Sequence, residues 1–245
     1  MKIAVLVSQV PDTTTKIVID GSSIDESDIT WILNPYAEFA IEKALKLKEA
    51  DSKVEEVVLV AMGPERSTEA LRQGLAMGAD SAILIKSDHI NTEVLANKVK
   101  ELGAELVLGG KKTIDTESSW TEAAVAAQLD LAFVHTANKL DWNGDAVLAS
   151  REISGEKQSF KVNLPALITC DKGDDEPRYA SVMGIMKAKK KPLEEVDQAA
   201  DSNIGITVVE AELPPARQAV KLFEGSPEEA AEQLLTALRE EAKVL

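Results

Sequence analysis

"VEEVVLVAMGPERSTEALRQGLAMGADSAILIK", residues 54–86, decides the fold, because it places a helical pattern between two apolar runs. Residues 54–62 predict a strand, residues 63–79 a helix and residues 81–86 a second strand. Both runs are apolar almost throughout, which is typical of parallel strands buried on both faces. A unit of this kind predicts a parallel pair joined by a right-handed crossover helix.

The same alternation extends to both sides of this unit. Residues 3–7 predict a first strand, and "LNPYAEFAIEKALKLKEA" (33–50) predicts an amphipathic helix with Asn34 as N-cap and Pro35 at its first position. A helix (91–102), a strand (104–110) and a further helix (115–129) follow. Residues 1 to about 130 therefore predict an α/β fold, a parallel sheet covered by helices on both faces.

The pattern becomes rich in β-structure after Leu131. Asn143-Gly144 and Ser154-Gly155 predict hairpin turns, and the strands around them either extend the first sheet or form a small antiparallel layer. The segment from Lys187 to about Ile204 is rich in charged residues and contains Pro192, which indicates a linker. Ser226 and Glu229 predict a capping box before an amphipathic helix. We expect an α/β domain with a β-rich extension over residues 1–190, then a linker and C-terminal arm over 191–245.

Composition excludes several classes of function. Asp and Glu (42) outnumber Lys and Arg (27), the net charge is -15, and only 4% of residues are aromatic, so nucleic acid is not an expected partner. Cys170 is the only cysteine, and the two histidines, His89 and His135, stand alone, so neither a disulfide nor a metal site is expected. With no signal peptide and no apolar stretch of ~20 residues, we expect a soluble, cytoplasmic protein.

Loops at the carboxyl ends of the strands should line any ligand site of a parallel sheet. These are residues 8–12, 61–63 and 109–121, and neither a G-x-G-x-x-G nor a P-loop pattern is present. "GGKKTIDTESSWT" (109–121) brings hydroxyl groups to an expected helix start, which suits a phosphate; an ordinary capped loop is an equally good interpretation. Asp115 is either the cap or an acceptor for a ribose or base. No catalytic constellation is apparent.

"REISGEKQSFKVNLPALITCDKGDDEPRYASVMGIMKAKKKP", residues 151–192, resembles a signature of the small (beta) subunits of electron transfer flavoproteins. The matching features are R-E-x-x-G, L-P-A-x-x-T and P-R-Y-x-x-x-x-x-I-M-x-A-x-K-K-K. Segments such as "LNPYAEFAIEKALKLKE", "LAMGAD", "AELVLGGKKTID" and "ELPPARQAVKL" are also similar to that family.

The resemblance implies a Rossmann-like adenine-nucleotide-binding sandwich and an electron carrier without substrate turnover of its own. The small subunit would hold AMP and pair with a large (alpha) subunit that carries the redox-active FAD. Acyl-CoA dehydrogenases of fatty acid β-oxidation, or other flavin dehydrogenases, would donate electrons, and a membrane quinone oxidoreductase is a possible acceptor. The implied nucleotide-binding residues are Leu6, Asn34, Pro35, Tyr36, Ala37, Met62, Gly110, Lys111, Lys112, Thr113, Ile114, Asp115, Thr116, Glu117, Ser118, Ser119, Trp120 and Thr121.

The resemblance also implies surfaces that face partners. Glu152 would face the flavin domain of the large subunit, and Val182 would stand at the leucine that anchors the dehydrogenase. The implied docking loop comprises Arg178, Tyr179, Ala180, Ser181, Val182, Met183, Gly184, Ile185, Met186 and Lys187, with Lys187 to Lys191 supplying charge. Among its departures from the family pattern, the chain has Trp120 where a glutamine or small residue is common and Glu122 where a glycine is common.

Two other interpretations remain open. In the same family, an electron-bifurcating subunit would bind a second FAD in place of AMP and oxidise NADH. In another class, the first 130 residues would suit a stand-alone nucleotide-binding stress or regulatory protein, although the β-rich segment and the C-terminal arm favour an obligate heterodimer.

Overall fold

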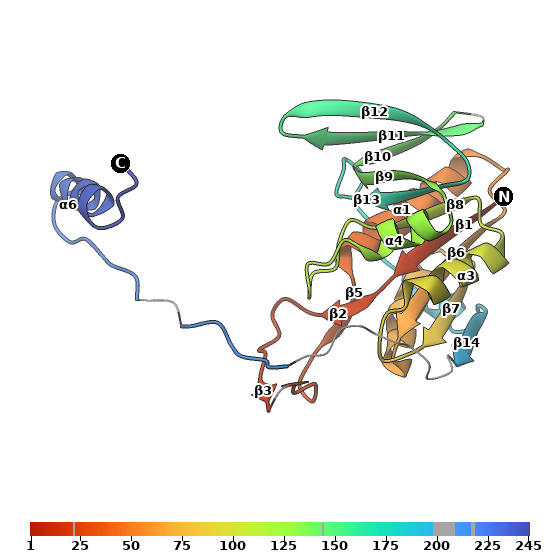
Figure 1. The fold of residues 1–245 in the computed structure, drawn as a ribbon, viewed down its shortest axis with the longest axis horizontal. Helices are drawn as coiled ribbons and strands as arrows, with labels where there is room; N and C mark the ends of the chain where they lie inside the picture. Colours follow the sequence, from red (N-terminus) through yellow and green to blue (C-terminus); the bar gives the residue numbers. More distant parts are fainter. Residues whose placement is uncertain (22, 144, 198–208, 217–218) are drawn as a thin grey trace.

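The main sheet of the computed structural model is parallel throughout (Figure 1). The structure describes residues 1–21, 23–143, 145–197, 209–216 and 219–245, and all statements below concern these residues. Within them the sheet has seven strands in the order β14-β7-β6-β1-β8-β13-β9. Their bounds are β1 Lys2–Val7, β6 Glu56–Gly63, β7 Ser81–Lys86, β8 Leu106–Gly110, β9 Ala132–Ala137, β13 Ala166–Cys170 and β14 Leu193–Asp197. The predicted α/β class with a parallel sheet is confirmed.

Helices cover both faces of the sheet, and β1 shows why. Ile3, Val5 and Val7 point into a core shared with α1 (Pro35–Ala50) and α2 (Thr68–Met77). Ala4 and Leu6 point to the opposite face, into a core shared with α3 (Thr92–Leu102) and α4 (Thr121–Gln128). Alternate side chains of one strand are thus buried on two sides, which explains the uninterrupted apolar run in the sequence.

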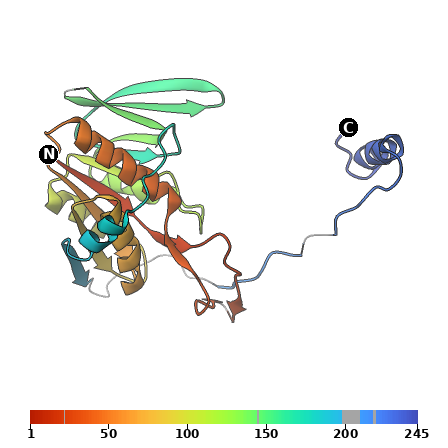
Figure 2. The same ribbon diagram turned by 180° about the vertical axis from the view of Figure 1, so that it is seen from behind.

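A small antiparallel sheet packs beside β9 and α1 at one end of the molecule (Figures 1 and 2). Its strands are β10 (Lys139–Asn143), β11 (Ala146–Ile153) and β12 (Glu156–Asn163). Ser154 and Gly155 both have positive φ, as a two-residue hairpin turn of the expected kind requires. The other predicted turn includes Gly144, which lies outside the described residues. The two alternatives for the strands after Leu131, extension of the main sheet and a small antiparallel layer, are each correct in part. β9 and β13 extend the main sheet, while β10–β12 form a separate layer.

Two short antiparallel ribbons follow β1. In one, β2 (Gln9–Pro11) pairs with β5 (Trp31–Leu33), and in the other β3 (Ile19–Asp20) pairs with β4 (Ser23–Ile24). A 3-10 turn, η1 (Glu65–Ser67), joins β6 to α2. In Figure 1, β2, β5 and β3 lie beyond the carboxyl end of β1.

The C-terminal third differs from the sequence interpretation in one respect. Residues 187–204 were expected to form a linker, yet β14 lies within them and pairs in parallel with β7, so the sheet continues past residue 190. After α5 (Val182–Ala188) and β14, the capping box of Ser226 and Glu229 opens α6 (Pro227–Glu240) as predicted. α6 has no buried residue and stands apart from the sheet in Figures 1 and 2. None of the described helices is long and apolar enough to cross a bilayer.

Candidate functional site

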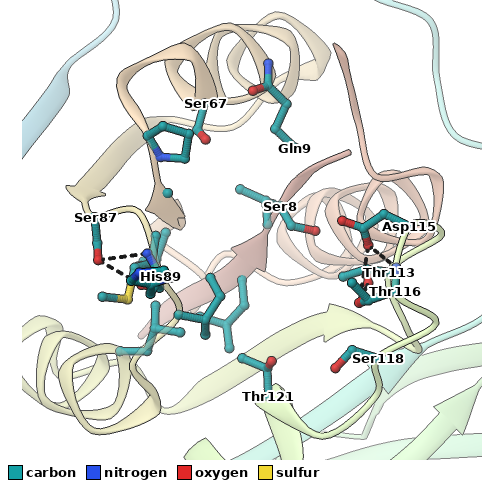
Figure 3. Close-up of a pocket in the computed structure, with 18 of the residues that line it drawn as sticks. Ser8, Gln9, Ser67, Ser87, His89, Thr113, Asp115, Thr116, Ser118 and Thr121 are labelled. Atoms are coloured by element: carbon teal, nitrogen blue, oxygen red, sulfur yellow. Dashed lines mark hydrogen bonds between the residues drawn. The ribbon is translucent and has the colours of Figure 1, made fainter. Parts of the chain in front are cut away.

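A cavity of about 660 Å³ opens at the carboxyl ends of β1, β6 and β7 (Figure 3). β1 has β6 on one side and β8 on the other, so the chain order reverses at this point, as it does at ligand sites of open parallel sheets. The cavity floor is apolar and is formed by Leu6, Val60, Met62 and Leu95. Its volume and its apolar floor suit a small organic ligand.

The loop between β8 and α4 forms one wall of the cavity, and α1 holds it in place. Asn34 Nδ2 donates to the carbonyl of Lys112 at 2.9 Å. A Cβ at Gly110 would lie 2.9 Å from atoms of Tyr36, so only glycine allows the loop to approach α1 this closely. The backbone N–H of Thr113 donates to the carbonyl of Ser118 at 2.9 Å and closes the loop. The loop shape is therefore fixed by the protein itself.

Three buried polar atoms of residues lining this cavity have no hydrogen-bond partner among the described residues: Ser118 Oγ, Gln9 Oε1 and Arg66 Nε. Buried polar atoms are normally satisfied, so these three could pair with a ligand or a water molecule in the cavity. Four further unpaired atoms, on Thr15, Asn34, Thr68 and Trp142, belong to residues outside the lining. Gln9 Oε1 can accept a hydrogen bond, Arg66 Nε can donate one, and Ser118 Oγ can do both. Arg66 itself is held by stacking on Trp31, 3.5 Å from the ring centre, and by Glu26 at 3.2 Å.

Glu122 brings a carboxyl group to the same cavity from the first turn of α4. Its side chain packs on Gly109, where an added Cβ would lie 2.6 Å from Glu122 Cγ. Burial raises the pKa of Glu122 to about 7, an effect that a hydrogen bond from its own backbone N–H partly opposes. Trp120 is 53% exposed and lies at the rim of the cavity.

The structure separates the predicted nucleotide residues into two groups. The first group lines the cavity: Leu6, Met62, Thr113, Asp115, Thr116, Ser118, Trp120 and Thr121. The second group lies outside the lining and includes Asn34, Pro35, Tyr36, Ala37, Gly110, Lys111, Lys112, Ile114, Glu117 and Ser119. Within it, the α1 residues support the loop from behind, Lys111 pairs with Asp171 at 2.9 Å, and Lys112 pairs with Glu117.

One sequence expectation about this loop was wrong. The helix was expected from Asp115, but α4 begins at Thr121, so Asp115 does not cap it; Asp115 Oδ1 instead accepts from the backbone N–H of Thr116 at 2.7 Å. Asn34 is the N-cap residue of α1 as predicted, although its side chain makes no capping hydrogen bond. Its Nδ2 donates to the carbonyl of Lys112, and its buried Oδ1 has no partner among the described residues.

Sequence reasoning missed the far wall of the cavity. That wall comprises Trp31, Pro64, Arg66, Ser67, Ser87, Asp88, His89 and Ile90. The rule that selected the loops after β1, β6 and β8 would also have selected residues 87–90 after β7, because they follow the next strand at the same edge.

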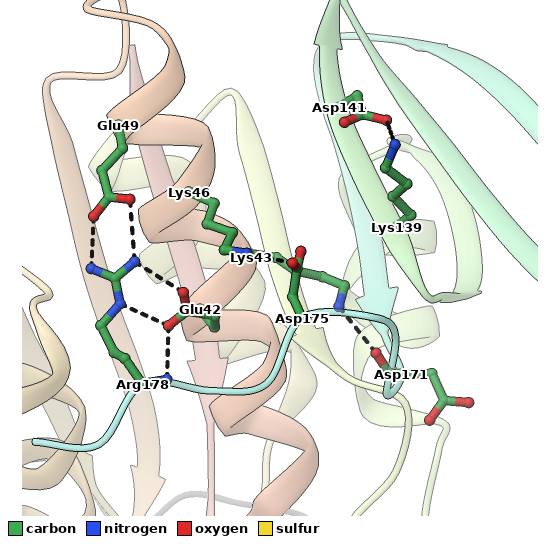
Figure 4. A network of polar contacts seen from close by, with 9 residues as sticks. All are labelled: Glu42, Lys43, Lys46, Glu49, Lys139, Asp141, Asp171, Asp175 and Arg178. Carbon is green, nitrogen blue, oxygen red and sulfur yellow. Dashed lines mark hydrogen bonds and ion pairs between the residues drawn. The ribbon is translucent and has the colours of Figure 1, made fainter.

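Arg178, the first residue of the predicted docking loop, is held against α1 (Figure 4). Glu42, whose side chain is 4% exposed, accepts from Arg178 Nε at 2.8 Å, from Nη2 at 2.9 Å and from the backbone N–H at 3.0 Å. Glu49 accepts from Nη1 at 2.6 Å. These carboxylates raise the pKa of Arg178 above its ordinary value, the Glu42 hydrogen bonds contributing most.

The segment after Arg178 exposes apolar side chains. Tyr179 is 97% exposed and Val182 78% exposed, and Met183, Ile185 and Met186 on α5 also face solvent. Ser181 caps α5 by accepting from the N–H of Gly184 at 3.0 Å. Large exposed apolar side chains grouped in one short segment are typical of an interaction site. We call Tyr179 to Met186 the α5 surface.

The basic residues after α5 do not all supply free charge. Lys191 Nζ donates to the carbonyls of Leu75 and Ala79 at the end of α2, and burial lowers the pKa of Lys191. Lys191 is thus a capping group of α2, and the earlier assignment of surface charge to it was wrong.

Glu152 and Arg151 point to opposite sides of β11, as predicted. Glu152 is exposed, whereas Arg151 stacks over Phe160, 5.1 Å from the ring centre, and donates to the carbonyl of His135. His135 Nδ1 lies 2.8 Å from Thr169 Oγ1, so this histidine satisfies a local hydrogen bond as expected. Cys170 is fully buried, as expected for a strand residue, and burial raises the pKa of its thiol to about 12.

Comparisons with known proteins identify the family of this chain. A family model described as "Electron transfer flavoprotein domain" matches residues 22–201, well over half of the chain. The chain is 39% identical to the electron transfer flavoprotein subunit beta of Bacillus subtilis, with all of both chains covered. It is 37% identical to that of Bradyrhizobium diazoefficiens, again over all of both chains, and 33% identical to that of Homo sapiens, covering all of this chain and 99% of the human one. The chain therefore belongs to the electron transfer flavoprotein family, among its beta subunits.

Proposed function

We propose that this chain is the small subunit of a heterodimeric electron carrier that accepts electrons from flavin dehydrogenases and passes them to a downstream acceptor. The observation that carries the proposal is the pairing of two features on one fold. One is an open, preformed cavity lined by residues with unpaired polar atoms, and the other is the exposed α5 surface. The carrier itself performs no catalysis in this proposal.

The cavity is proposed to hold AMP as a structural ligand. Its apolar floor suits an adenine ring, and its hydroxyl groups suit a ribose and a phosphate. The N-terminus of α4, with Ser118 and Thr121 beside it, offers backbone N–H groups and a favourable dipole to the phosphate. Leu6 and Met62 in the cavity floor belong to the ends of β1 and β6. A bound nucleotide would therefore contact both strands and the loop after β8.

The redox-active FAD is proposed to lie in the large subunit. The exposed face of the small antiparallel sheet, which carries Glu152, would turn toward the flavin domain, and the C-terminal arm with α6 would pack on the large subunit. α6 supports this role because Leu234 and Leu235 are exposed on it, and an amphipathic helix normally buries such residues. The α5 surface would receive the dehydrogenase, such as an acyl-CoA dehydrogenase, and a membrane quinone oxidoreductase would serve as acceptor. A reducing compartment, the cytoplasm, suits the single buried thiol of Cys170.

The experiment that tests this proposal is a nucleotide count. The chain is co-expressed with a cognate large subunit, the purified complex is denatured, and released nucleotides are quantified. We expect one FAD and one AMP per heterodimer. Two FAD and no AMP would replace the carrier with an electron-bifurcating subunit. A nucleotide-loaded monomer that does not bind the large subunit would indicate a stand-alone regulatory protein.

A further inference from the structure

We propose that Glu122 makes the binding of a nucleotide phosphate in the cavity dependent on the uptake of a proton by its own carboxyl group. The proposal rests on the proposed function, because it assumes that a phosphate enters this cavity. It assigns Glu122 as the residue that distinguishes a phosphorylated ligand from a neutral nucleoside.

The Glu122 carboxyl group lies where the phosphate of the ligand is proposed to bind. A helix N-terminus attracts anions because its first N–H groups are unpaired and its dipole is positive there. Glu122 lies in the first turn of α4, lines the cavity and receives a hydrogen bond from its own backbone N–H. When ionised, its carboxylate therefore takes part of the attraction that a phosphate would use.

A second feature marks the same place as a ligand site. Ser118 Oγ is buried, lines the cavity and has no partner among the described residues. The Glu122 side chain lies over Gly109 at the end of β8, where an added Cβ would be 2.6 Å from Glu122 Cγ. A phosphate bound beside Ser118 and Thr121 must then share the site with the Glu122 carboxyl group.

The protonation state of this carboxyl group decides between repulsion and a hydrogen bond. Two anions in one poorly hydrated site repel each other, whereas a neutral carboxylic acid can donate its proton to a phosphate oxygen. Burial already brings the pKa of Glu122 to about 7, so the protonated form is accessible near neutral pH. An adjacent phosphate would raise that pKa further, and phosphate binding above pH 7 would then draw a proton from solution.

The neighbouring charged groups do not replace Glu122 in this role. β1 contributes no titratable side chain to the cavity, and the thiol on β13, Cys170, is neutral at these pH values. The remaining titratable or charged groups lining the cavity are Arg66 from η1, Asp88 and His89 after β7, and Asp115 in the loop after β8. None of these is packed over the end of β8 as Glu122 is over Gly109.

Isothermal titration calorimetry on the full chain in complex with its large subunit, freed of bound nucleotide, tests the proposal. AMP and adenosine are titrated between pH 7.0 and 8.5, in buffers whose ionisation enthalpies differ so that proton uptake can be counted. AMP is mainly dianionic over this range, so its own titration contributes little. We expect the affinity for AMP to fall by up to about tenfold per pH unit, with uptake approaching one proton, and the affinity for adenosine to change little.

Glu122→Gln removes the titration while keeping the shape of the side chain. The variant should bind AMP with little pH dependence and no proton uptake. Glu65→Gln is the matched control, because Glu65 is an exposed acid of η1 outside the cavity lining, and it should behave as the unmodified chain does. If Glu122→Gln fails to fold, the AMP and adenosine titrations of the unmodified complex still decide.

Equal affinity for AMP across this pH range, without proton uptake, overturns the proposal while leaving nucleotide binding intact. A parallel fall for AMP and adenosine also overturns it, because Glu122 would then act on the nucleoside. If neither compound binds at any pH, the proposed nucleotide function fails, and this proposal fails with it.

Discussion

Replacing Arg178 with alanine should destabilise the chain far more than the loss of one surface ion pair. Glu42 is 4% exposed at its side chain and accepts two hydrogen bonds from the Arg178 guanidinium, at 2.8 and 2.9 Å. Without the guanidinium, this buried carboxylate keeps only the backbone N–H of residue 178. Breaking a buried pair from one side costs about 3–5 kcal/mol. Because Arg178 is one-third exposed and water can enter, we expect a value near the lower end, about 3 kcal/mol.

Urea unfolding followed by circular dichroism measures the change in the free energy of unfolding. Glu49→Ala provides the control, because it removes a partner of the same arginine whose side chain is 59% exposed, and it should cost at most about 1 kcal/mol. Replacing both Glu42 and Arg178 with methionine should recover much of the loss, since no charge is then left buried alone.

The reasoning is refuted if Arg178→Ala costs no more than Glu49→Ala. It is also refuted if the double methionine variant is as unstable as the sum of its single changes, because the two side chains would then be independent.

The other predictions concern the two surfaces and the buried acids. Val182→Asp should slow electron transfer from the dehydrogenase in a reductase assay while the bound flavin and the melting temperature stay unchanged, because the side chain is 78% exposed. Gly110→Ala should cost about 1–3 kcal/mol in urea unfolding and weaken nucleotide retention, because the new Cβ would meet Tyr36 at 2.9 Å. The raised pKa of Glu122 means that its folded form holds a proton that the unfolded chain releases, so its contribution to stability falls as pH rises from about 4.5 to about 7; Glu122→Gln should flatten that part of a stability-against-pH curve, on the order of 1–3 kcal/mol. Cys170 should resist a thiol reagent in the native state and react only after unfolding, because it is buried and its pKa is raised to about 12.

The repeating pattern of strands and helices was predictable because it depends on local sequence alone. β7 spans the same residues, 81–86, in the prediction and in the structure. The buried alternation along β1 follows from the same rule. The cavity edge was predictable in outline for a similar reason, since the carboxyl ends of parallel strands must meet at one side.

The failures have a common cause, which is contact between residues distant in sequence. Asn34 is the N-cap of α1 as predicted, but its side chain makes no capping bond, and its Nδ2 donates to the carbonyl of Lys112, 78 residues away. The serines at 118 and 119 favour a helix start, but the loop closure from Thr113 to Ser118 delays α4 to Thr121. The sequence of β14, "LEEVD", resembles a polar linker. A strand at the sheet edge that buries little of its surface can be this polar.

α1 contacts both candidate functional regions, the loop after β8 and the root of the α5 surface, and its sequence contains residues suited to each contact. Its start holds the loop after β8 through Asn34 and through the close packing of Tyr36 on Gly110, while Glu42 in its middle holds Arg178 at the root of the α5 surface. A buried acid within a helix is otherwise unfavourable, and here it is explained by the arginine that it fixes. Both contacts are made by one continuous helix that packs on the sheet. A ligand that contacts the loop and a partner that binds the α5 surface would therefore act on two regions that pack against the same helix.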